Sequence, residues 1–127
     1  MARLIVLDAC VLIALTDQTN TNHDSARRLL STNDQLAITA LTGAEVMVYP
    51  IPKAQGGWSE LLRDLAIEVV AITAEDMEAI AATRRQSQLK MPDAIVLWLA
   101  RQRGACVGTF DEKLAAKARQ YGLAVRP

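Results

Sequence analysis

Histidine and cysteine, on which much enzyme chemistry depends, are scarce: the 127-residue sequence has one histidine and two cysteines. Cys10 and Cys106 lie far apart in apolar stretches and form no Cys-x-x-Cys pair, so we expect both to be reduced and buried. So few sulfur and nitrogen ligands argue against a zinc site. The single histidine also excludes, within one chain, the two-histidine chemistry of metal-free ribonucleases. A Ser–His–Asp triad would have to use His23, which we interpret as a loop or helix-cap residue.

Long hydrophobic runs are missing as well. Asp8 and Asp17 interrupt the first apolar stretch before it reaches the ~18 residues of a membrane span, and the stretch has no signal-peptide cleavage pattern. We therefore expect a cytoplasmic protein with no membrane segment. The composition, 51% hydrophobic and 22% charged, is typical of a globular protein. The length favours a single domain over residues 1–127.

Net charge is absent too, but the charges are unevenly distributed. Residues 1–83 contain 5 Lys or Arg against 11 Asp or Glu, whereas residues 84–127 contain 9 against 3. Such asymmetry is typical of a surface that binds a polyanion, although ordinary solvated helix faces also produce it. The charge pattern alone leaves both interpretations open.

The apolar patterns predict strands that alternate with helices. Short apolar runs predict strands at 4–7, 35–39, 67–73, 105–110 and 123–126. Periodic segments predict helices at 22–34, 41–49, 58–65, 74–86, 93–103 and 111–121, with a loop at 51–57. This alternation predicts an α/β fold in which a parallel sheet carries helices on both faces.

The helix opened by Pro92 and Asp93 has an unusual surface. Ala94 to Ala100 is a run of seven apolar residues with no polar stripe. A helix that is apolar all round is buried all round. In a small domain this favours a homodimer in which a second copy covers the 93–100 region; the alternative is that neighbouring helices of the same chain cover it.

Four acids stand in otherwise apolar settings. Asp8 ends the first strand and Asp111 follows the fourth, so both are expected at the carboxyl end of the sheet, where ligands bind in such folds. Asp93 lies in the first turn of its helix, and the spacing does not decide whether that turn reaches the same edge. Glu45 is the one acid of an apolar helix.

If these acids converge, their repulsion needs compensation. Two carboxylates ~4 Å apart repel by about 4 kcal/mol at an effective dielectric constant of 20. A divalent cation removes that cost, and oxygen-only ligands suit Mg²⁺ or Mn²⁺. One or two such ions can support phosphodiester hydrolysis. The alternative is that the three aspartates cap helices and Glu45 is a surface residue. We favour the metal site because one of the acids ends a core strand.

Four segments in order, LIVLDACVLIAL, ITALTGAEVMV, MPDAIVLWLA and VGTFDEKLAAKA, resemble the PIN-domain family from Arg3 to Val125. Within it the chain is most similar to the ribonuclease toxins of VapBC-type toxin–antitoxin pairs. The resemblance implies a three-layer α/β/α sandwich, usually dimeric. It also implies that Asp8, Glu45, Asp93 and Asp111 bind Mg²⁺ or Mn²⁺ for endonucleolytic RNA cleavage, with Asp8 and Asp93 as the most direct ligands. Thr109 matches a hydroxyl position that supports the site.

Cys10 departs from the pattern of the family, which commonly has Ser, Thr or Asn there, and a thiol is a weaker hydrogen-bonding partner. Glu112 is interpreted as a first-turn acid of the last helix rather than a fifth ligand.

The resemblance also suggests partners. Arg84, Arg85 and Lys90 precede Asp93 and are candidates to hold RNA phosphates, as are Arg101, Arg103, Lys113 and Lys117. A small cognate antitoxin would cover the acids, with an arginine among them. A non-catalytic PIN-like scaffold that binds RNA or protein is the alternative function. Phosphatase and receiver patterns are not met, because Cys10 stands where an aspartyl phosphatase has its second Asp.

Overall fold

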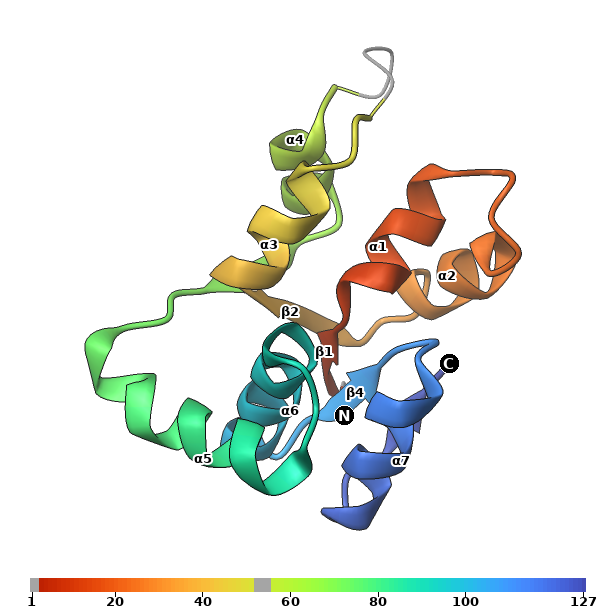
Figure 1. Ribbon diagram of the computed structural model, residues 1–127. Helices are drawn as coiled ribbons and strands as arrows, with labels where there is room; N and C mark the ends of the chain where they lie inside the picture. The colour runs from red at the N-terminus through yellow and green to blue at the C-terminus, as the bar shows by residue number, and fades with distance from the viewer. Residues whose placement is uncertain (1–2, 52–55) are drawn as a thin grey trace.

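The computed structural model, which describes residues 3–51 and 56–127, has a five-stranded parallel sheet between two layers of helices (Figure 1). The strand order is β3-β2-β1-β4-β5. The strands are β1 (Leu4–Leu7), β2 (Gln35–Thr39), β3 (Ile67–Val70), β4 (Cys106–Gly108) and β5 (Val125–Arg126). The helices are α1 (Ala9–Thr16), α2 (His23–Leu30), α3 (Ala40–Met47), α4 (Trp58–Asp64), α5 (Met77–Ser87), α6 (Met91–Arg103) and α7 (Glu112–Gln120), with a 3₁₀ turn η2 (Ala74–Asp76).

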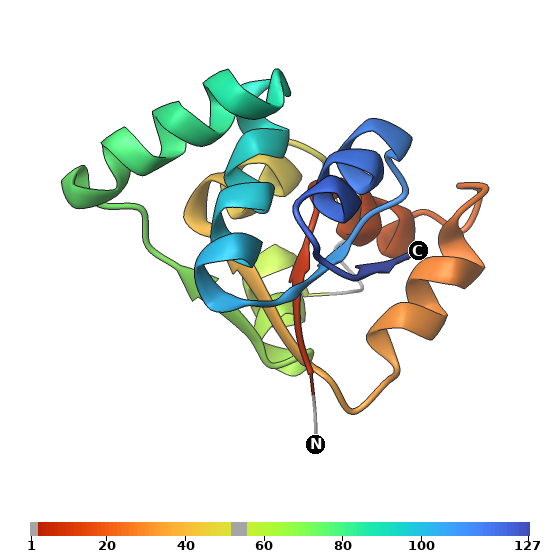
Figure 2. The same cartoon turned by 90° about the horizontal axis from the view of Figure 1, so that it is seen from below.

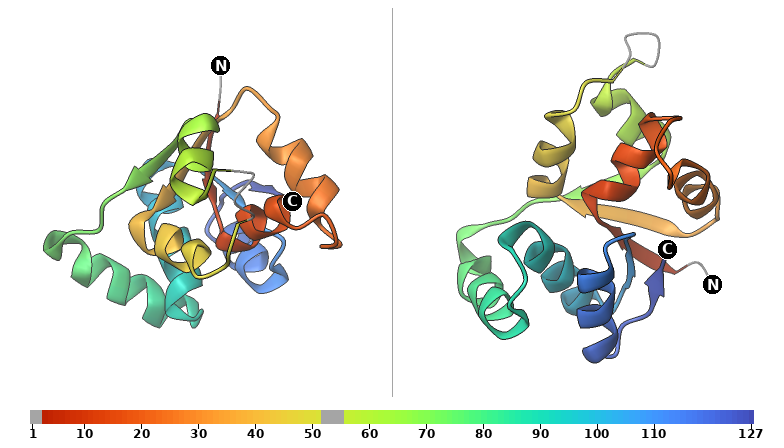
Figure 3. Two further views of the ribbon diagram at one scale, coloured as in Figure 1. Left: turned by 90° about the horizontal axis from the view of Figure 1, so that it is seen from above. Right: turned by 45° about the vertical axis from the view of Figure 1, so that its right-hand side comes forward.

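The first strand divides the hydrophobic core into two halves. Ile5 and Leu7 pack with residues of α1, α2, α3 and α4, whereas Val6 packs with residues of α5, α6 and α7. Successive side chains of a strand point to opposite faces, so β1 contributes to both halves and needs apolar residues throughout. The two groups of helices lie on opposite sides of the sheet (Figure 3). The expected three-layer α/β/α sandwich is thereby confirmed.

Three strands, β3, β4 and β5, are shorter than the apolar runs predict, whereas β1 and β2 have the predicted bounds. The run at 67–73 ends its pairing at Val70, because Val70 lies opposite Thr39, the last residue of β2. In the same way the run at 105–110 is a strand only over Cys106–Gly108, where Gly108 lies opposite Leu7 at the end of β1. A strand lasts only as long as a neighbour offers backbone groups.

Helix α1 is the element that the sequence pattern did not identify. It is almost entirely apolar, with Ala9, Val11, Leu12 and Ala14 buried, so it has no polar stripe to reveal a helical period. His23 begins α2, and its ring Nδ1 is hydrogen-bonded to the Ala14 carbonyl at 2.9 Å, which links the two helices.

Two other predicted segments need comment. The predicted helix at 74–86 begins as the 3₁₀ turn η2, which carries a capping box between Thr73 and Asp76. The predicted loop at 51–57 lies partly outside the described residues, since 52–55 are not described. None of the helices within the described residues is both long and apolar enough to cross a membrane.

The buried surface of α6 corrects the argument for a homodimer. All seven residues from Ala94 to Ala100 are at most 5% exposed within this one chain. Helix α6 lies between α5 and α7 and packs on β1, β2 and β4, as seen in Figure 2. The chain's own neighbours therefore bury the helix all round. The burial of α6 therefore gives no reason to place a second copy over the 93–100 region, and the homodimer itself stays a prediction.

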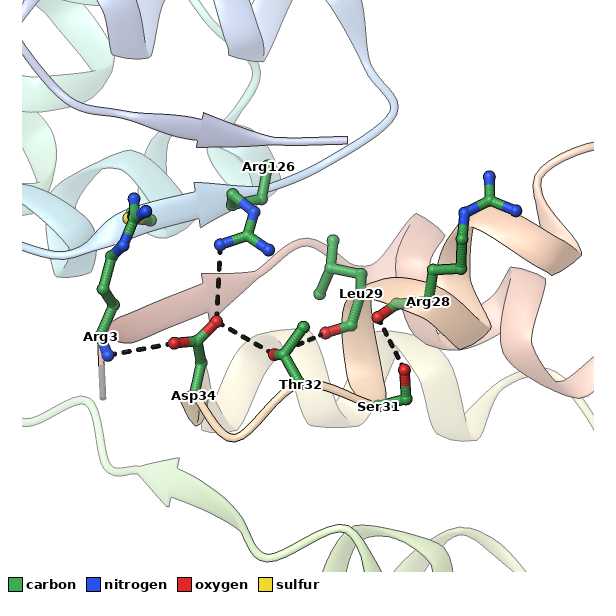
Figure 4. Close-up of polar contacts among 8 residues, drawn as sticks. Arg3, Arg28, Leu29, Ser31, Thr32, Asp34 and Arg126 are labelled. Carbon is green, nitrogen blue, oxygen red and sulfur yellow. Dashed lines mark hydrogen bonds and ion pairs between the residues drawn. The ribbon is translucent and has the colours of Figure 1, made fainter. Parts of the chain in front are cut away.

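A group of polar contacts lies at the amino-terminal edge of the sheet, where β1 and β2 begin (Figure 4). Asp34 accepts hydrogen bonds from the backbone N–H of Arg3 at 3.1 Å and from the hydroxyl of Thr32 at 3.0 Å. It also pairs with Arg126 of β5 at 3.5 Å. These contacts, the Arg3 bond foremost, lower the pKa of Asp34. One carboxylate thus ties the starts of β1 and β2 to the last strand.

We expect Leu97→Ala to lower the free energy of unfolding by about 3 kcal/mol, because it opens a cavity at a side chain that is 0% exposed. The loss should be the same at low and high protein concentration, since the burial comes from one chain. Urea denaturation at two concentrations measures both.

Met91→Ala is the control for Leu97→Ala, because Met91 belongs to the same helix but is 43% exposed. A destabilisation by Leu97→Ala that grows with protein concentration would contradict burial within a single chain.

Candidate functional site

Two neighbouring strands bring the first pair of candidate residues together at the carboxyl edge of the sheet. Leu7 of β1 lies opposite Gly108 of β4, and the N–H of Asp8 donates to the Gly108 carbonyl at 2.9 Å. A Cβ on Gly108 would come within 2.9 Å of the Leu7 side chain, so any larger residue would force that side chain to shift. The residues that follow the two strands, Asp8 and Thr109, therefore lie side by side.

The carboxylate of Asp8 is only 8% exposed, and its two hydrogen bonds both go to Oδ2. The Thr109 hydroxyl donates at 2.7 Å and the Cys10 thiol donates at 3.1 Å. Asp8 occupies the N-cap position of α1, yet its side chain accepts no cap hydrogen bond. The capping interpretation therefore fails for Asp8, and its carboxylate is buried for another reason.

Cys10 hydrogen-bonds directly to one of the acids, although a thiol is a weak hydrogen-bonding group. Its sulfur donates to Asp8 and accepts the backbone N–H of Phe110 at 3.4 Å. Burial, together with the negative charge of Asp8, raises the pKa of the Cys10 thiol to about 12. The thiol is therefore protonated at neutral pH and can donate a hydrogen bond to Asp8, as a Ser or Thr hydroxyl at this position would. Both cysteines are reduced, as predicted, but only Cys106 is buried; Cys10, which faces the acids, is partly buried.

Asp93 is the acid most strongly affected by the others. It is the third residue of α6, just after Pro92 in the first turn. Burial raises its pKa to about 6, and the charges of Asp8, Asp111 and Glu45 add to the rise. Lys90 opposes them. The start of α6 therefore lies at the same edge as Asp8, which the spacing in the sequence could not decide.

Glu45 reaches this edge from α3, which follows β2, the other neighbour of β1. The helix is fixed at its start because the buried Thr39 side chain accepts the N–H of Thr42 at 3.0 Å. Burial raises the pKa of Glu45, and the charge of Asp8 raises it further. Four acids from four segments thus influence one another through their charges.

Asp111 serves a structural purpose as well. Its Oδ1 accepts the N–H groups of Lys113 and Leu114 at 2.8 and 3.1 Å, which caps α7. Its own N–H donates to the hydroxyl of Thr109 at 3.0 Å. The capping interpretation is therefore correct for Asp111, although both cap bonds use one oxygen. Glu112, the next residue, is the exposed first residue of α7.

A cleft of about 480 Å³ opens beside two of the acids. It is lined by Gln88, Leu89, Lys90, Asp93, Asp111, Glu112 and Lys113. Lys90 and Lys113 thus stand on the cleft from the starts of α6 and α7. Arg84 and Arg85 are exposed on α5 but do not line it. From the sequence, Lys113 was only one of several basic residues near the later helices. Its place two residues after Asp111, the cap of α7, is the signal that could have identified it as a cleft residue.

Two of the basic residues considered for RNA contact are engaged elsewhere. The Arg101 guanidinium lies 4.1 Å from the centre of the Tyr121 ring. Arg103 makes two hydrogen bonds to Glu68, at 2.8 and 3.1 Å. Both lie ~12–15 Å further along α6 than Asp93, so we withdraw them from the proposed RNA surface.

The acids do not form a ready-made cage for a metal ion. Within the described residues, no group of three or more His, Cys, Asp or Glu side chains is arranged so that it could hold one. Mg²⁺ usually keeps several water molecules and binds through only one or two carboxylates. The oxygen-only donors fit such a hydrated ion, and the pKa of Asp93 is raised by burial first and then by the charges of the other acids.

Known proteins share this architecture. The chain is similar to a toxin–antitoxin complex from Klebsiella pneumoniae, with 27% identity, a TM-score of 0.68, and 88% of this chain and 90% of that chain covered. VapC20 of Mycobacterium tuberculosis, a toxin that cleaves the sarcin–ricin loop, is 21% identical with a TM-score of 0.69 and coverage of 97% and 99%. VapBC2 of Rickettsia felis, bound to promoter DNA, is 16% identical with a TM-score of 0.64 and coverage of 96% and 96%.

No curated protein sequence matches the chain significantly. The sequence profile of the PIN domain, however, matches residues 5–120, nearly the whole chain. This match includes the ends of β1 and β4 and the start of α6, where the acids lie. The chain therefore belongs to the PIN-domain family.

Proposed function

We propose that this PIN-domain protein is a Mg²⁺- or Mn²⁺-dependent endoribonuclease and the toxin of a type II toxin–antitoxin pair that acts in the cytoplasm. The proposal rests on the group of acids beside one cleft: Asp93 and Asp111 line it, and burial together with the charges of Asp8, Asp111 and Glu45 raises the pKa of Asp93 to about 6. Negative charge gathered in a partly buried site is stable only with a positive partner. A divalent cation is the partner that also supports hydrolysis of a phosphodiester.

Asp8 and Asp93 are the proposed direct ligands, and Glu45 and Asp111 complete the site directly or through water. When bound, the ion supplies a Lewis acid for the phosphodiester and lowers the pKa of a water molecule. The capping bonds of Asp111 use only Oδ1, which leaves its Oδ2 for the site.

The chain's own contribution is to hold the Asp8 carboxylate in one orientation. Thr109 and Cys10 both donate to Oδ2, so Oδ1 is left for a cation or for water. Thr109 in turn accepts the N–H of Asp111, which connects two of the acids through one hydroxyl. Such preorganisation removes the cost of ordering the groups when the substrate arrives.

RNA phosphates are proposed to bind at the cleft beside Asp93. Lys90 and Lys113 line it, and Arg84 and Arg85 on α5 could hold the strand further along. Cations placed next to a cluster of acids let a polyanion approach that the acids alone would repel.

A small antitoxin is the proposed protein partner. Similar solved structures from Klebsiella pneumoniae and Rickettsia felis are described as a toxin–antitoxin complex and as VapBC2. An arginine of such a partner would satisfy the acids by charge-assisted hydrogen bonds and exclude the cation. We propose no dimer surface on α6, since its apolar side chains are covered within the chain.

We expect purified protein to cleave a pool of structured RNAs with Mg²⁺ or Mn²⁺ and to lose the activity in EDTA. Asp93→Asn should reduce the rate at least 100-fold, because it removes one proposed ligand charge. Gel analysis of end-labelled RNA gives the rates, and calorimetry gives metal binding. Asp64→Asn is the matched control, since Asp64 is exposed at the end of α4.

Cleavage that survives EDTA or Asp93→Asn would contradict a metal-dependent site. Absence of both metal binding and cleavage would favour a non-catalytic scaffold. Metal binding without cleavage would retain the site and require a different RNA.

In metal-free protein, the pKa of Asp93 near 6 predicts how stability changes with pH. The folded protein binds this proton more tightly than the unfolded chain, whose carboxyl titrates near 3.8. Stability from this group is therefore fully present below about pH 4 and is lost as the pH rises through about 6. At pH 7.5, Asp93→Asn should be more stable than wild type by about 1 kcal/mol after allowance for solvent screening.

Urea denaturation in EDTA at pH 4.5 and pH 7.5 measures this effect. The difference between the two proteins should shrink at pH 4.5, and Asp64→Asn should show no such change. Wild type as stable as Asp93→Asn at pH 7.5 would contradict the raised pKa of Asp93, to which both burial and the other acids contribute. Mg²⁺ should stabilise wild type more than the variant.

Replacing the two cleft lysines should weaken RNA binding for every sequence and reduce its salt dependence. Each lost phosphate contact lowers the slope of log K against log salt by about 0.7 for a single strand. Lys90→Gln and Lys113→Gln are compared by fluorescence anisotropy at several salt concentrations in EDTA. Arg63→Gln, at an exposed position on α4, is the control. An unchanged slope would remove that lysine from the proposed contact surface.

A further inference from the structure

A second cavity adjoins the cleft at Glu112, which lines both. It has a volume of about 480 Å³ and is lined by residues that include Asn22, Thr109, Phe110, Glu112 and Arg119. We propose that this cavity is a nucleobase subsite, in which Phe110 stacks on a base of the RNA strand that is cleaved at the acids. The inference rests on the proposed function and specifies how that site selects its substrate.

The position of the cavity connects it to the acids. Thr109 lines it and also donates to the carboxylate of Asp8 at 2.7 Å. Phe110 lies between Thr109 and the cap residue Asp111. Glu112 lines both this cavity and the lysine cleft, so the two adjoin at the start of α7. The described chain ends between α2 and α7, in the same region (Figures 1 and 2). A strand whose phosphate occupies the cleft can therefore place a neighbouring base in the cavity.

The lining of the cavity suits a base better than a phosphate. It combines an aromatic ring, an amide, one carboxylate and one guanidinium, whereas the cleft has two lysines. Bases stack on aromatic rings and are recognised by hydrogen bonds to their edges. Guanine has two adjacent N–H donors, from which a carboxylate such as Glu112 can accept hydrogen bonds. It also has two adjacent acceptors, to which a guanidinium such as Arg119 can donate. The subsite should therefore prefer guanine.

The ring of Phe110 is held in place before any ligand binds. It is partly buried and packs against the core formed with α1 and α2. Its backbone N–H donates to the sulfur of Cys10 at 3.4 Å, which fixes the chain just before the cap of α7. A rigid aromatic surface loses little conformational freedom on binding, so the stacking contact is retained in the affinity.

The test measures binding of two RNA octamers, U8 and the same strand with one central guanosine. Fluorescence anisotropy in EDTA separates binding from metal-dependent cleavage. Wild type should bind the guanosine octamer about tenfold more tightly than U8. Phe110→Leu should weaken binding of both octamers about tenfold, the scale of one stacked base, whereas Phe110→Tyr, which keeps an aromatic ring, should retain the affinity. Glu112→Gln and Arg119→Gln should each remove most of the preference for guanosine.

Each outcome supports or overturns the proposal. Equal loss with Phe110→Leu and Phe110→Tyr would show that the residue is only structural and would overturn the stacking subsite. Equal affinity of wild type and Phe110→Leu, with RNA cleavage intact, would overturn the subsite and leave the nuclease proposal standing. Failure of wild type to bind or cleave any RNA would overturn the proposed function as well. Arg63→Gln serves again as the surface control.

Discussion

The pairing of β1 with β4 is the constraint on which the site depends. It places Leu7 opposite Gly108, and the next residues then bring the Thr109 hydroxyl within 2.7 Å of the Asp8 carboxylate. Glycine suits this pairing, since a Cβ at position 108 would come within 2.9 Å of the Leu7 side chain and that side chain would have to shift. The same hydroxyl accepts the N–H of Asp111, so one contact between strands positions two acids and the start of α7.

The negative charges at the carboxyl edge of the sheet destabilise the fold that the apolar core stabilises. The apolar core on both sides of β1 stabilises the chain, whereas burial and three neighbouring charges raise the pKa of Asp93 to about 6. Proteins keep such unfavourable charge mainly where a ligand compensates for it. The opposite edge shows the contrast: Asp34 has donors from Arg3, Thr32 and Arg126, and its pKa is lowered.

Several residues of the site have structural and proposed chemical roles at once. Asp111 caps α7 with one oxygen, and Cys10 is a partly buried residue that packs against the core and also donates to Asp8. The two interpretations that the sequence opposed, helix cap or site residue, are therefore compatible at Asp111. At Asp8 they are not, because its side chain caps nothing.

The sequence by itself determined the layered α/β fold, most of the elements and the identity of the acids. These follow from local patterns: apolar runs such as Leu4–Leu7, helical periods, and charges isolated among apolar residues. It did not reveal α1, whose uniformly apolar residues show no period, nor how far β3, β4 and β5 extend.

The spacing left open whether Asp93 shares an edge with Asp8, which only the family resemblance implied, and the tertiary structure alone decided that α6 is buried by its own chain and that Lys113 lines the cleft. Each of these depends on the strand order and on which helices cover each face. Such contacts join residues far apart in the sequence, and local propensity carries no information about them.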